Sequence, residues 1–256
     1  MSTIAITGAA GGIGLATRAR LESDGHTVIG VDQHDAEVVA DLATPEGRLD
    51  MIEGVTKACS GVLDGLVAAA GIAGGDEALV VSINYFGAVA TLDGLRPLLS
   101  RGHLPSAVAL SSNSTTTQPG VGPEVAAACL AGDESESREL ARRFPGSNYP
   151  ATKLALAHWV RAQAVTADWI GSGIRLNAIA PGLIATPMTV KDMEFILGLG
   201  EIFPIPARRA GTAEEVAGLL AYLLSAEAGF FCGSVIFMDG GTDAAVRGEA
   251  WPTLRA

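Results

Sequence analysis

Tyr149 and Lys153 stand four positions apart in the segment SNYPATKLAL, in a chain that has only three tyrosines and three lysines. In a helix, side chains at this spacing project from the same face, one turn apart. A nearby ammonium group favours the phenolate and lowers the pKa of a phenol from about 10 towards neutrality. The pair therefore predicts acid–base chemistry on a carbonyl or an alcohol. The alternative is a solvated lysine one turn from a half-buried tyrosine.

A glycine-rich segment, TGAAGGIG at residues 7–14, lies between a predicted strand and a predicted helix. Gly8, Gly12 and Gly14 allow a tight turn and let a pyrophosphate approach the amide groups at the helix N-terminus. Asp32 ends the second predicted strand, 18 residues beyond Gly14, where a carboxylate can accept hydrogen bonds from a ribose. Together these features predict a dinucleotide site.

Asp32 also indicates which dinucleotide is bound. A 2′-phosphate would meet its carboxylate, and the next residues, Gln33, His34 and Asp35, supply no fixed positive charge. The glycine-rich segment contains no arginine or lysine either. We therefore expect NAD rather than NADP as the cofactor.

The composition limits the classes of partner. The 256 residues are 48% hydrophobic and include 32 glycines, which is typical of a folded globular chain. The formal net charge of -11 argues against nucleic acid or anionic lipid as a partner. No uninterrupted apolar run reaches the roughly 18 residues that span a membrane, so we expect no membrane association.

The first residues, MSTIAITGAAGG, lack a basic segment before their apolar stretch and do not resemble a signal peptide. Cys59, Cys129 and Cys232 are odd in number and have no metal-ligand spacing. We expect reduced cysteines, no metal and a cytoplasmic protein.

Short apolar runs alternate with longer helical patterns along the whole chain. The predicted strands are 3–7, 27–31, 65–70, 107–111, 174–180 and 234–239. The predicted helices are 12–24, 44–59, 82–100, 149–171 and 212–225. Continuously apolar strands fit a parallel sheet that is covered on both faces. The pattern predicts an α/β fold, a doubly wound, mostly parallel sheet of the Rossmann type in a single domain over residues 1–256.

Two longer segments interrupt this alternation. Residues 113–147 contain DESESRELARRF, whose initial acids and final arginines suit a helix. Residues 186–207 are apolar with interspersed glycine and proline, as in a lid over a site. Met188, Met193 and Phe203 of this lid predict a pocket for a hydrophobic alcohol or ketone, of steroid, terpenoid or aryl type. The alternative for each of them is that it only packs the lid helix onto the core.

The motifs together resemble the short-chain dehydrogenase/reductase family. TGAAGGIG, the serine pair at the end of the strand 107–111, YPATK, RLNAIAPGLIATPM and MDGG occur in the family's order and cover essentially the whole chain. The segment DAEVVADL and the long 113–147 insertion look nearest to the bacterial branch that contains the 3α-hydroxysteroid dehydrogenase/carbonyl reductases.

The resemblance implies catalytic roles for four residues. Tyr149 would be the general acid/base, and Lys153 would bind the nicotinamide ribose and lower the pKa of the tyrosine. Ser112 would hydrogen-bond the substrate oxygen. Asn84 would hold a proton-relay water near the lysine, and the alternative is an asparagine inside a helix whose side chain bonds the backbone.

The resemblance also implies the residues that bind the cofactor. They follow the dinucleotide from the pyrophosphate through the adenosine to the nicotinamide: Gly8, Gly12, Ile13, Gly14, Asp32, Asp41, Leu42, Gly71, Tyr149, Lys153, Pro181, Gly182, Ile184 and Thr186.

The chain departs from the family pattern in two places. The usual Asn-Asn-Ala-Gly is AAAG here, and Ser112 and Tyr149 are 37 positions apart instead of about a dozen. Because the insertion precedes a helix that many relatives use as a subunit interface, we expect a homodimer, with a tetramer as the alternative. Ser111 and Ser114 remain alternatives to Ser112.

The expected function is that of an NAD-dependent oxidoreductase that interconverts a hydrophobic secondary alcohol and its ketone. An NADP-linked carbonyl reductase and a non-catalytic, dinucleotide-sensing binding protein are the alternatives.

Overall fold

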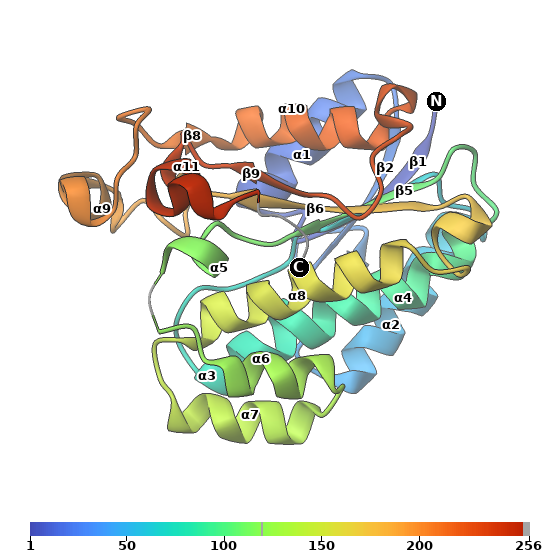
Figure 1. The fold of residues 1–256 in the computed structure, drawn as a ribbon. Helices are drawn as coiled ribbons and strands as arrows, with labels where there is room; N and C mark the ends of the chain where they lie inside the picture. The colour runs from blue at the N-terminus through green and yellow to red at the C-terminus, as the bar shows by residue number, and fades with distance from the viewer. Residues whose placement is uncertain (119, 253–256) are drawn as a thin grey trace.

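A seven-stranded parallel sheet forms the centre of the computed structural model, which describes residues 1–118 and 120–252 (Figure 1). The strand order is β3-β2-β1-β4-β5-β6-β9, and all six pairings are parallel. The strands are β1 (Thr3–Thr7), β2 (Thr27–Asp32), β3 (Val38–Val39), β4 (Gly65–Ala68), β5 (Ser106–Leu110), β6 (Arg175–Pro181) and β9 (Val235–Met238). The predicted doubly wound α/β fold is confirmed.

All six predicted strands are present within a few residues of their predicted ends. The prediction missed β3, which has only two residues and is recognised by its pairing with β2 and not by its own pattern. Residues 119 and 253–256, which fall in the predicted insertion and at the end of the predicted domain, lie outside the described residues.

Helices cover both faces of the sheet, as the apolar strands require. Figure 1 shows α1 (Gly12–Ser23) and α10 (Ala213–Leu224) packed together on one face. The other face carries α2 (Pro45–Ala58), α4 (Ala88–Leu99) and α8 (Asn148–Ala164). The helix predicted over 149–171 therefore ends earlier, at Ala164, and a separate 3₁₀ turn follows over Ile170–Ser172.

The helix predicted over 82–100 is longer and contains a break in its hydrogen-bond pattern. It consists of α3 (Glu77–Val81), a π-helical turn over Ser82–Gly87, and α4. The whole span, Glu77–Leu99, is long and apolar enough to cross a membrane, but 67% of its most apolar window is buried inside the fold. It is therefore accounted for as a core helix. Such π-turns occur often at functional sites.

The insertion adds a further layer outside the helices of one face. It contains α5 (Ser114–Thr117), α6 (Pro123–Leu130) and α7 (Glu134–Arg143). Helix α6 packs on α8, and α7 packs on α3 and α6 (Figure 1). The predicted charge arrangement of α7 is present, with acids in its first turn and arginines in its last.

The lid segment and the C-terminal part contain short elements. They are β7 (Ile184–Ala185), α9 (Met193–Gly198), a 3₁₀ turn (Gly200–Ile202), β8 (Gly211–Thr212), a 3₁₀ turn (Ala226–Ala228), α11 (Thr242–Arg247) and a 3₁₀ turn (Gly248–Ala250). β7 and β8 pair in parallel as a separate two-stranded sheet.

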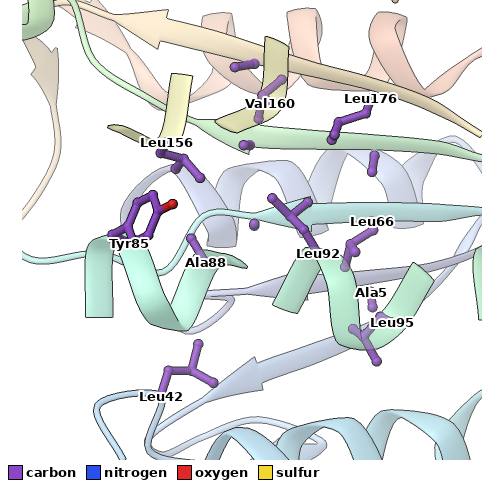
Figure 2. Packing of buried hydrophobic residues seen from close by; sticks show 14 of the residues in the cluster. Ala5, Leu42, Leu66, Tyr85, Ala88, Leu92, Leu95, Leu156, Val160 and Leu176 are labelled. Atoms are coloured by element: carbon purple, nitrogen blue, oxygen red, sulfur yellow. The ribbon is translucent and has the colours of Figure 1, made fainter. Parts of the chain in front are cut away.

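Two apolar clusters hold the layers together, one on each face of the sheet. In β1, Ala5 belongs to one cluster, whereas Ile4 and Ile6 belong to the other, as the alternation of side chains along a strand requires. Figure 2 shows the first cluster, in which Leu92 of α4 and Leu156 of α8 meet residues of the sheet. Full burial of each such leucine contributes about 1.5–3 kcal/mol.

Candidate active site

A pocket opens at the carboxyl ends of β1, β4, β5 and β6, where the strand order reverses between β1 and β4. Ligands of doubly wound folds bind at this switch point. The lining includes most of the predicted site residues: Gly8, Gly12, Ile13, Gly14, Asp32, Leu42, Gly71, Ser112, Tyr149, Lys153, Pro181, Gly182, Ile184, Thr186 and Met188.

The glycines of the first loop are required by close backbone contacts. Gly8 has φ +72°, and a Cβ there would lie 3.0 Å from the backbone of Ala70. A Cβ on Gly14 would lie 2.0 Å from the carbonyl oxygen of Gly8, which no side chain can tolerate. No side chain caps the N-terminus of α1 at Gly11. The loop can therefore present its amide groups to an anion.

Asp32 lies at the end of β2 and lines the same pocket. Its Oδ2 accepts a hydrogen bond from the Ala10 amide at 2.9 Å, and its Oδ1 accepts one from the Gln33 amide at 2.7 Å. These bonds fix the carboxylate beside the glycine loop, in the position expected for a group that binds ribose hydroxyls.

Tyr149 and Lys153 lie one turn apart on α8, as predicted, and both line the pocket. The Lys153 Nζ is 5.7 Å from the centroid of the Tyr149 ring and donates a hydrogen bond to the Leu110 carbonyl at 2.8 Å. Lys153 is only 4% exposed, and burial lowers the pKa of its ammonium to about 8.

The expected lowering of the tyrosine pKa is not found in this structure. Burial raises the pKa of Tyr149, and the neighbouring Ser112 hydroxyl offsets only part of that shift. The reason is that desolvation disfavours the charged phenolate. Sequence spacing identifies the lysine as a neighbour but does not reveal how far both groups are removed from water.

The three candidate serines occupy different environments. The Ser112 hydroxyl lines the pocket, interacts with Tyr149 and accepts a hydrogen bond from the Ser114 amide at 3.2 Å. Ser111 also lines the pocket, but its hydroxyl donates to the Lys153 carbonyl at 2.9 Å. Ser114 is buried outside the lining residues. The geometry favours Ser112 as the residue that meets a substrate oxygen.

Asn84 lies in the π-helical turn behind the pocket and is fully buried. Its side-chain amide pairs with the backbone of Ile72, accepting at 2.9 Å and donating at 2.9 Å. A Cβ on Gly71 would lie 3.1 Å from the Asn84 Oδ1 and 3.3 Å from the Lys153 Nζ. Asn84 and Lys153 therefore both approach the backbone of Gly71.

Four predicted site residues are not in the pocket lining among the described residues: Asp41, Asn84, Met193 and Phe203. The Asp41 carboxylate instead accepts a hydrogen bond from the Ala43 amide at 2.9 Å and shapes the loop before α2. The prediction also missed several lining residues next to predicted ones: Gly11, Val31, Gln33, Ala40, Ala69, Ala70, Ile72, Ile83, Leu110, Pro187 and Thr189. Most follow the carboxyl ends of strands, a position from which they could have been inferred.

The lid segment closes one side of the pocket against the glycine loop. A Cβ on Gly12 would lie 3.6 Å from the side chain of Thr186. Gly182, in the preceding turn, is needed for another reason, because a Cβ there would lie 2.6 Å from that of Asp239. The lining also includes Met188, which is 47% exposed.

Comparison with known proteins agrees with this geometry. A family model described as the NAD dependent epimerase/dehydratase family matches residues 4–186, and one described as enoyl-(acyl carrier protein) reductase matches residues 144–243. The chain is 41% identical to the 3-alpha-hydroxysteroid dehydrogenase/carbonyl reductase of Comamonas testosteroni, over 96% of this chain and 98% of that protein.

The chain belongs to the short-chain dehydrogenase/reductase family. It is also 32% identical to the coniferyl-alcohol dehydrogenase of Pseudomonas sp. strain HR199, over 93% of this chain and 95% of that one. The crystal structure of a 3-alpha-hydroxysteroid dehydrogenase from Pseudomonas sp. B-0831, complexed with NADH, matches with a TM-score of 0.89 and 43% identity. That match covers 99% of this chain and 100% of the other.

These similarities confirm the predicted family and the predicted resemblance of the chain to the hydroxysteroid dehydrogenase/carbonyl reductase branch. They also confirm the prediction that the protein is an oxidoreductase. The expectation of NAD agrees with the NADH complex of the Pseudomonas sp. B-0831 enzyme.

Proposed function

We propose that the protein is an NAD-dependent oxidoreductase that interconverts a hydrophobic secondary alcohol and its ketone. The observation that carries the proposal is the convergence of Ser112, Tyr149 and Lys153 on the same pocket as the glycine loop and Asp32. A protein that only binds a dinucleotide has no need for a tyrosine, a lysine and a serine arranged around one reacting oxygen.

The glycine loop would hold the pyrophosphate, and Asp32 would accept hydrogen bonds from the adenosine ribose. When bound, NAD supplies the acceptor or donor of hydride. Lys153 would bind the nicotinamide ribose and orient the cofactor. The site thus combines fixed amide donors at one end with the half-buried Tyr149 and the buried Lys153 at the other.

Tyr149 would exchange the proton of the substrate oxygen, donating it to a carbonyl in reduction and accepting it from an alcohol in oxidation. Ser112 would donate a hydrogen bond to the same oxygen and stabilise the negative charge that develops on it. The raised pKa of the Tyr149 phenol keeps the proton on the residue that must donate it in the reductive direction.

The lid favours a hydrophobic substrate. Met188 lines the pocket, and Phe195 and Ile202 in the same segment are 71% and 85% exposed. Such side chains would gain free energy by covering an apolar ligand. Among the named relatives are a hydroxysteroid dehydrogenase/carbonyl reductase and a coniferyl-alcohol dehydrogenase, so steroid and aryl alcohols are the first candidates. We also propose a cytoplasmic location, which the three free cysteines support.

The first test is absorbance of the reduced nicotinamide while the purified protein meets a panel of 3α-hydroxysteroids, terpenoid alcohols and aryl alcohols, with NAD and then with NADP. We expect turnover with NAD and at least one hydrophobic class. Turnover only with NADP would support the NADP-linked carbonyl reductase. Dinucleotide binding with no turnover on the panel would support the binding protein.

A tyrosine variant tests the assignment of the acid–base group. Tyr149→Phe keeps the ring but removes the hydroxyl, so we expect a loss of at least about 10³-fold in kcat, with NADH binding retained. Tyr222→Phe on the exposed side of α10 is the matched control and should leave kcat unchanged. Substantial turnover by Tyr149→Phe would refute the assignment.

A further inference from the structure

Arg48 is a buried arginine whose guanidinium lies behind the adenosine end of the pocket. It is 8% exposed, in the first turn of α2. Its Nε donates to the Leu42 carbonyl at 2.8 Å, and its Nη2 donates to the carbonyls of Ala43 at 3.3 Å and Ser82 at 3.0 Å. A buried charge is tolerated only when a counter-ion and hydrogen bonds replace the lost water.

The counter-ion comes from the insertion. Glu134, the first residue of α7, accepts two hydrogen bonds from Arg48, at 2.6 Å from Nη1 and 2.8 Å from Nη2. This is the bidentate geometry of the strongest arginine–carboxylate pairs. Burial alone would raise the pKa of Glu134, but the two hydrogen bonds from Arg48 and its positive charge outweigh this effect and keep the pKa below its usual value. The carboxylate is therefore charged at neutral pH.

The backbone that Arg48 binds belongs to two walls of the pocket. Leu42 lines the pocket, and Ser82 directly precedes Ile83, which also lines it. Figure 2 shows the Leu42 side chain directed towards Ala88 in the apolar cluster. Arg48 thus joins the loop after β3 to the π-helical turn, and neither Arg48 nor Glu134 lines the pocket among the described residues.

We propose that Arg48 and Glu134 are positioning residues for the adenosine end of the dinucleotide site, and that the insertion sets dinucleotide affinity through Glu134. The proposal rests on the proposed function, because it assumes that the pocket binds NAD. The carboxylate holds the guanidinium, and the guanidinium holds the Leu42 and Ala43 carbonyls against the turn that begins at Ser82. Without the carboxylate, the guanidinium would turn towards water and release the loop that carries Leu42.

The test compares Glu134→Ala, Glu134→Gln and Arg48→Lys with the wild-type protein. NADH and adenosine monophosphate binding are measured by titration calorimetry, and kcat is measured at saturating dinucleotide. For Glu134→Ala we expect Kd for both ligands to rise by about tenfold, equivalent to about 1.4 kcal/mol. Glu134→Gln keeps one acceptor and should show a smaller rise. Arg48→Lys loses the planar guanidinium that binds both carboxylate oxygens, so its Kd values should rise as much as those of Glu134→Ala. In all three, kcat should stay within about twofold.

Glu139→Gln is the matched control, since it removes an exposed ion pair with Arg143 from the same helix, α7. It should leave both Kd values unchanged. The proposal is overturned if the folded Glu134 variants bind NADH like the wild type, if kcat falls while Kd does not, or if Glu139→Gln weakens binding equally. If Glu134→Ala does not fold, the Kd and kcat values of Glu134→Gln and Arg48→Lys test the proposal by the same criteria. A wild-type protein that binds no dinucleotide contradicts the proposed function instead.

Discussion

At the scale of single residues, burial controls the chemistry of the site more than the proximity of charges. Desolvation raises the pKa of Tyr149 and lowers that of Lys153, so both shifts favour the neutral forms of the two side chains. The Lys153 Nζ retains one backbone acceptor, the Leu110 carbonyl. Tyr149 and Lys153 are therefore neutral over a wider pH range than their spacing in the sequence suggests.

This environment predicts an unusual titration for Lys153. With only three lysines in the chain, ¹³C-labelled lysine gives a simple NMR spectrum. We expect one Cε resonance with a midpoint near pH 8, the value to which burial lowers the pKa of Lys153, and we expect Lys153→Met to remove it. If that resonance titrates near the ordinary value of about 10.4, Lys153 is solvated and its assignment as a buried group fails.

The same shift has a consequence for stability. Between about pH 8 and 10.5, the unfolded chain carries a proton at Lys153 that the folded protein has lost. The unfolded state then binds more protons, so the contribution of this side chain to the free energy of unfolding increases as the pH rises through that window. In denaturant titrations across this window, the free energy of unfolding of the wild type minus that of Lys153→Met should increase as the pH rises.

Asp32 is the residue expected to select the dinucleotide. We expect Asp32→Ser to lower kcat/KM for NAD by about tenfold or more. The ratio of kcat/KM for NAD to kcat/KM for NADP should also fall, because the carboxylate that repels a 2′-phosphate is removed. Steady-state kinetics with both cofactors measure the ratio. Asp35→Ser, three positions along in the exposed loop, is the control. An unchanged ratio in Asp32→Ser would locate cofactor selection elsewhere.

At the scale of elements, the turn from β1 into α1 depends on one glycine contact. We expect Gly14→Ala to lower the free energy of unfolding by about 2 kcal/mol or more, because its Cβ would lie 2.0 Å from the Gly8 carbonyl oxygen. Gly11→Ala is the control, since nothing lies within 4 Å of a Cβ there, and it should change stability by less than about 0.5 kcal/mol. Denaturation of the cofactor-free protein measures both, and equal losses would contradict this explanation.

The elements also show which features could be predicted from the sequence. Strands such as Thr3–Thr7 could be predicted because their apolar runs reflect burial on both faces. The π-helical turn at Ser82–Gly87 could not, because the sequence pattern there does not distinguish an ordinary helix from the wider turn, which only tertiary contacts select. The end of α8 at Ala164 was also missed, since the helical pattern of the sequence continues beyond it.

Some residues of the candidate site could likewise be predicted from the sequence, and others could not. Gly14, Asp32 and Tyr149 could be predicted because motif spacing and strand ends place them at one edge of a parallel sheet. The pair formed by Arg48 and Glu134 could not, because its members are 86 positions apart and meet only through the packing of the insertion. Phe203 was predicted from its apolar character alone, which does not distinguish a pocket wall from a lid surface.

At the scale of the whole molecule, the insertion bears on assembly. Helix α6 packs on α8, and α7 packs beyond it on α3 (Figure 1). Helix α8, against which the insertion packs, is the helix that the resemblance to the family implies as a subunit interface. We therefore expect a homodimer, with a mass by light scattering of twice the 26.1 kDa of one chain. A mass of four chains would contradict the expectation and show that the insertion leaves that interface available.

The burial of Lys153 has a practical consequence for attaching the protein to a surface. Lys57 on α2 has a side chain that is 73% exposed, and Lys191 lies exposed in the lid segment, whereas Lys153 is 4% exposed. A solid surface that carries amine-reactive groups will therefore couple to the first two lysines and to the exposed Met1 amino group, and not to Lys153. Coupling through Lys191 would anchor the lid to a sensor chip or resin. Lys191→Arg would direct the linkage to Lys57 and the Met1 amino group and leave the mouth of the pocket unobstructed.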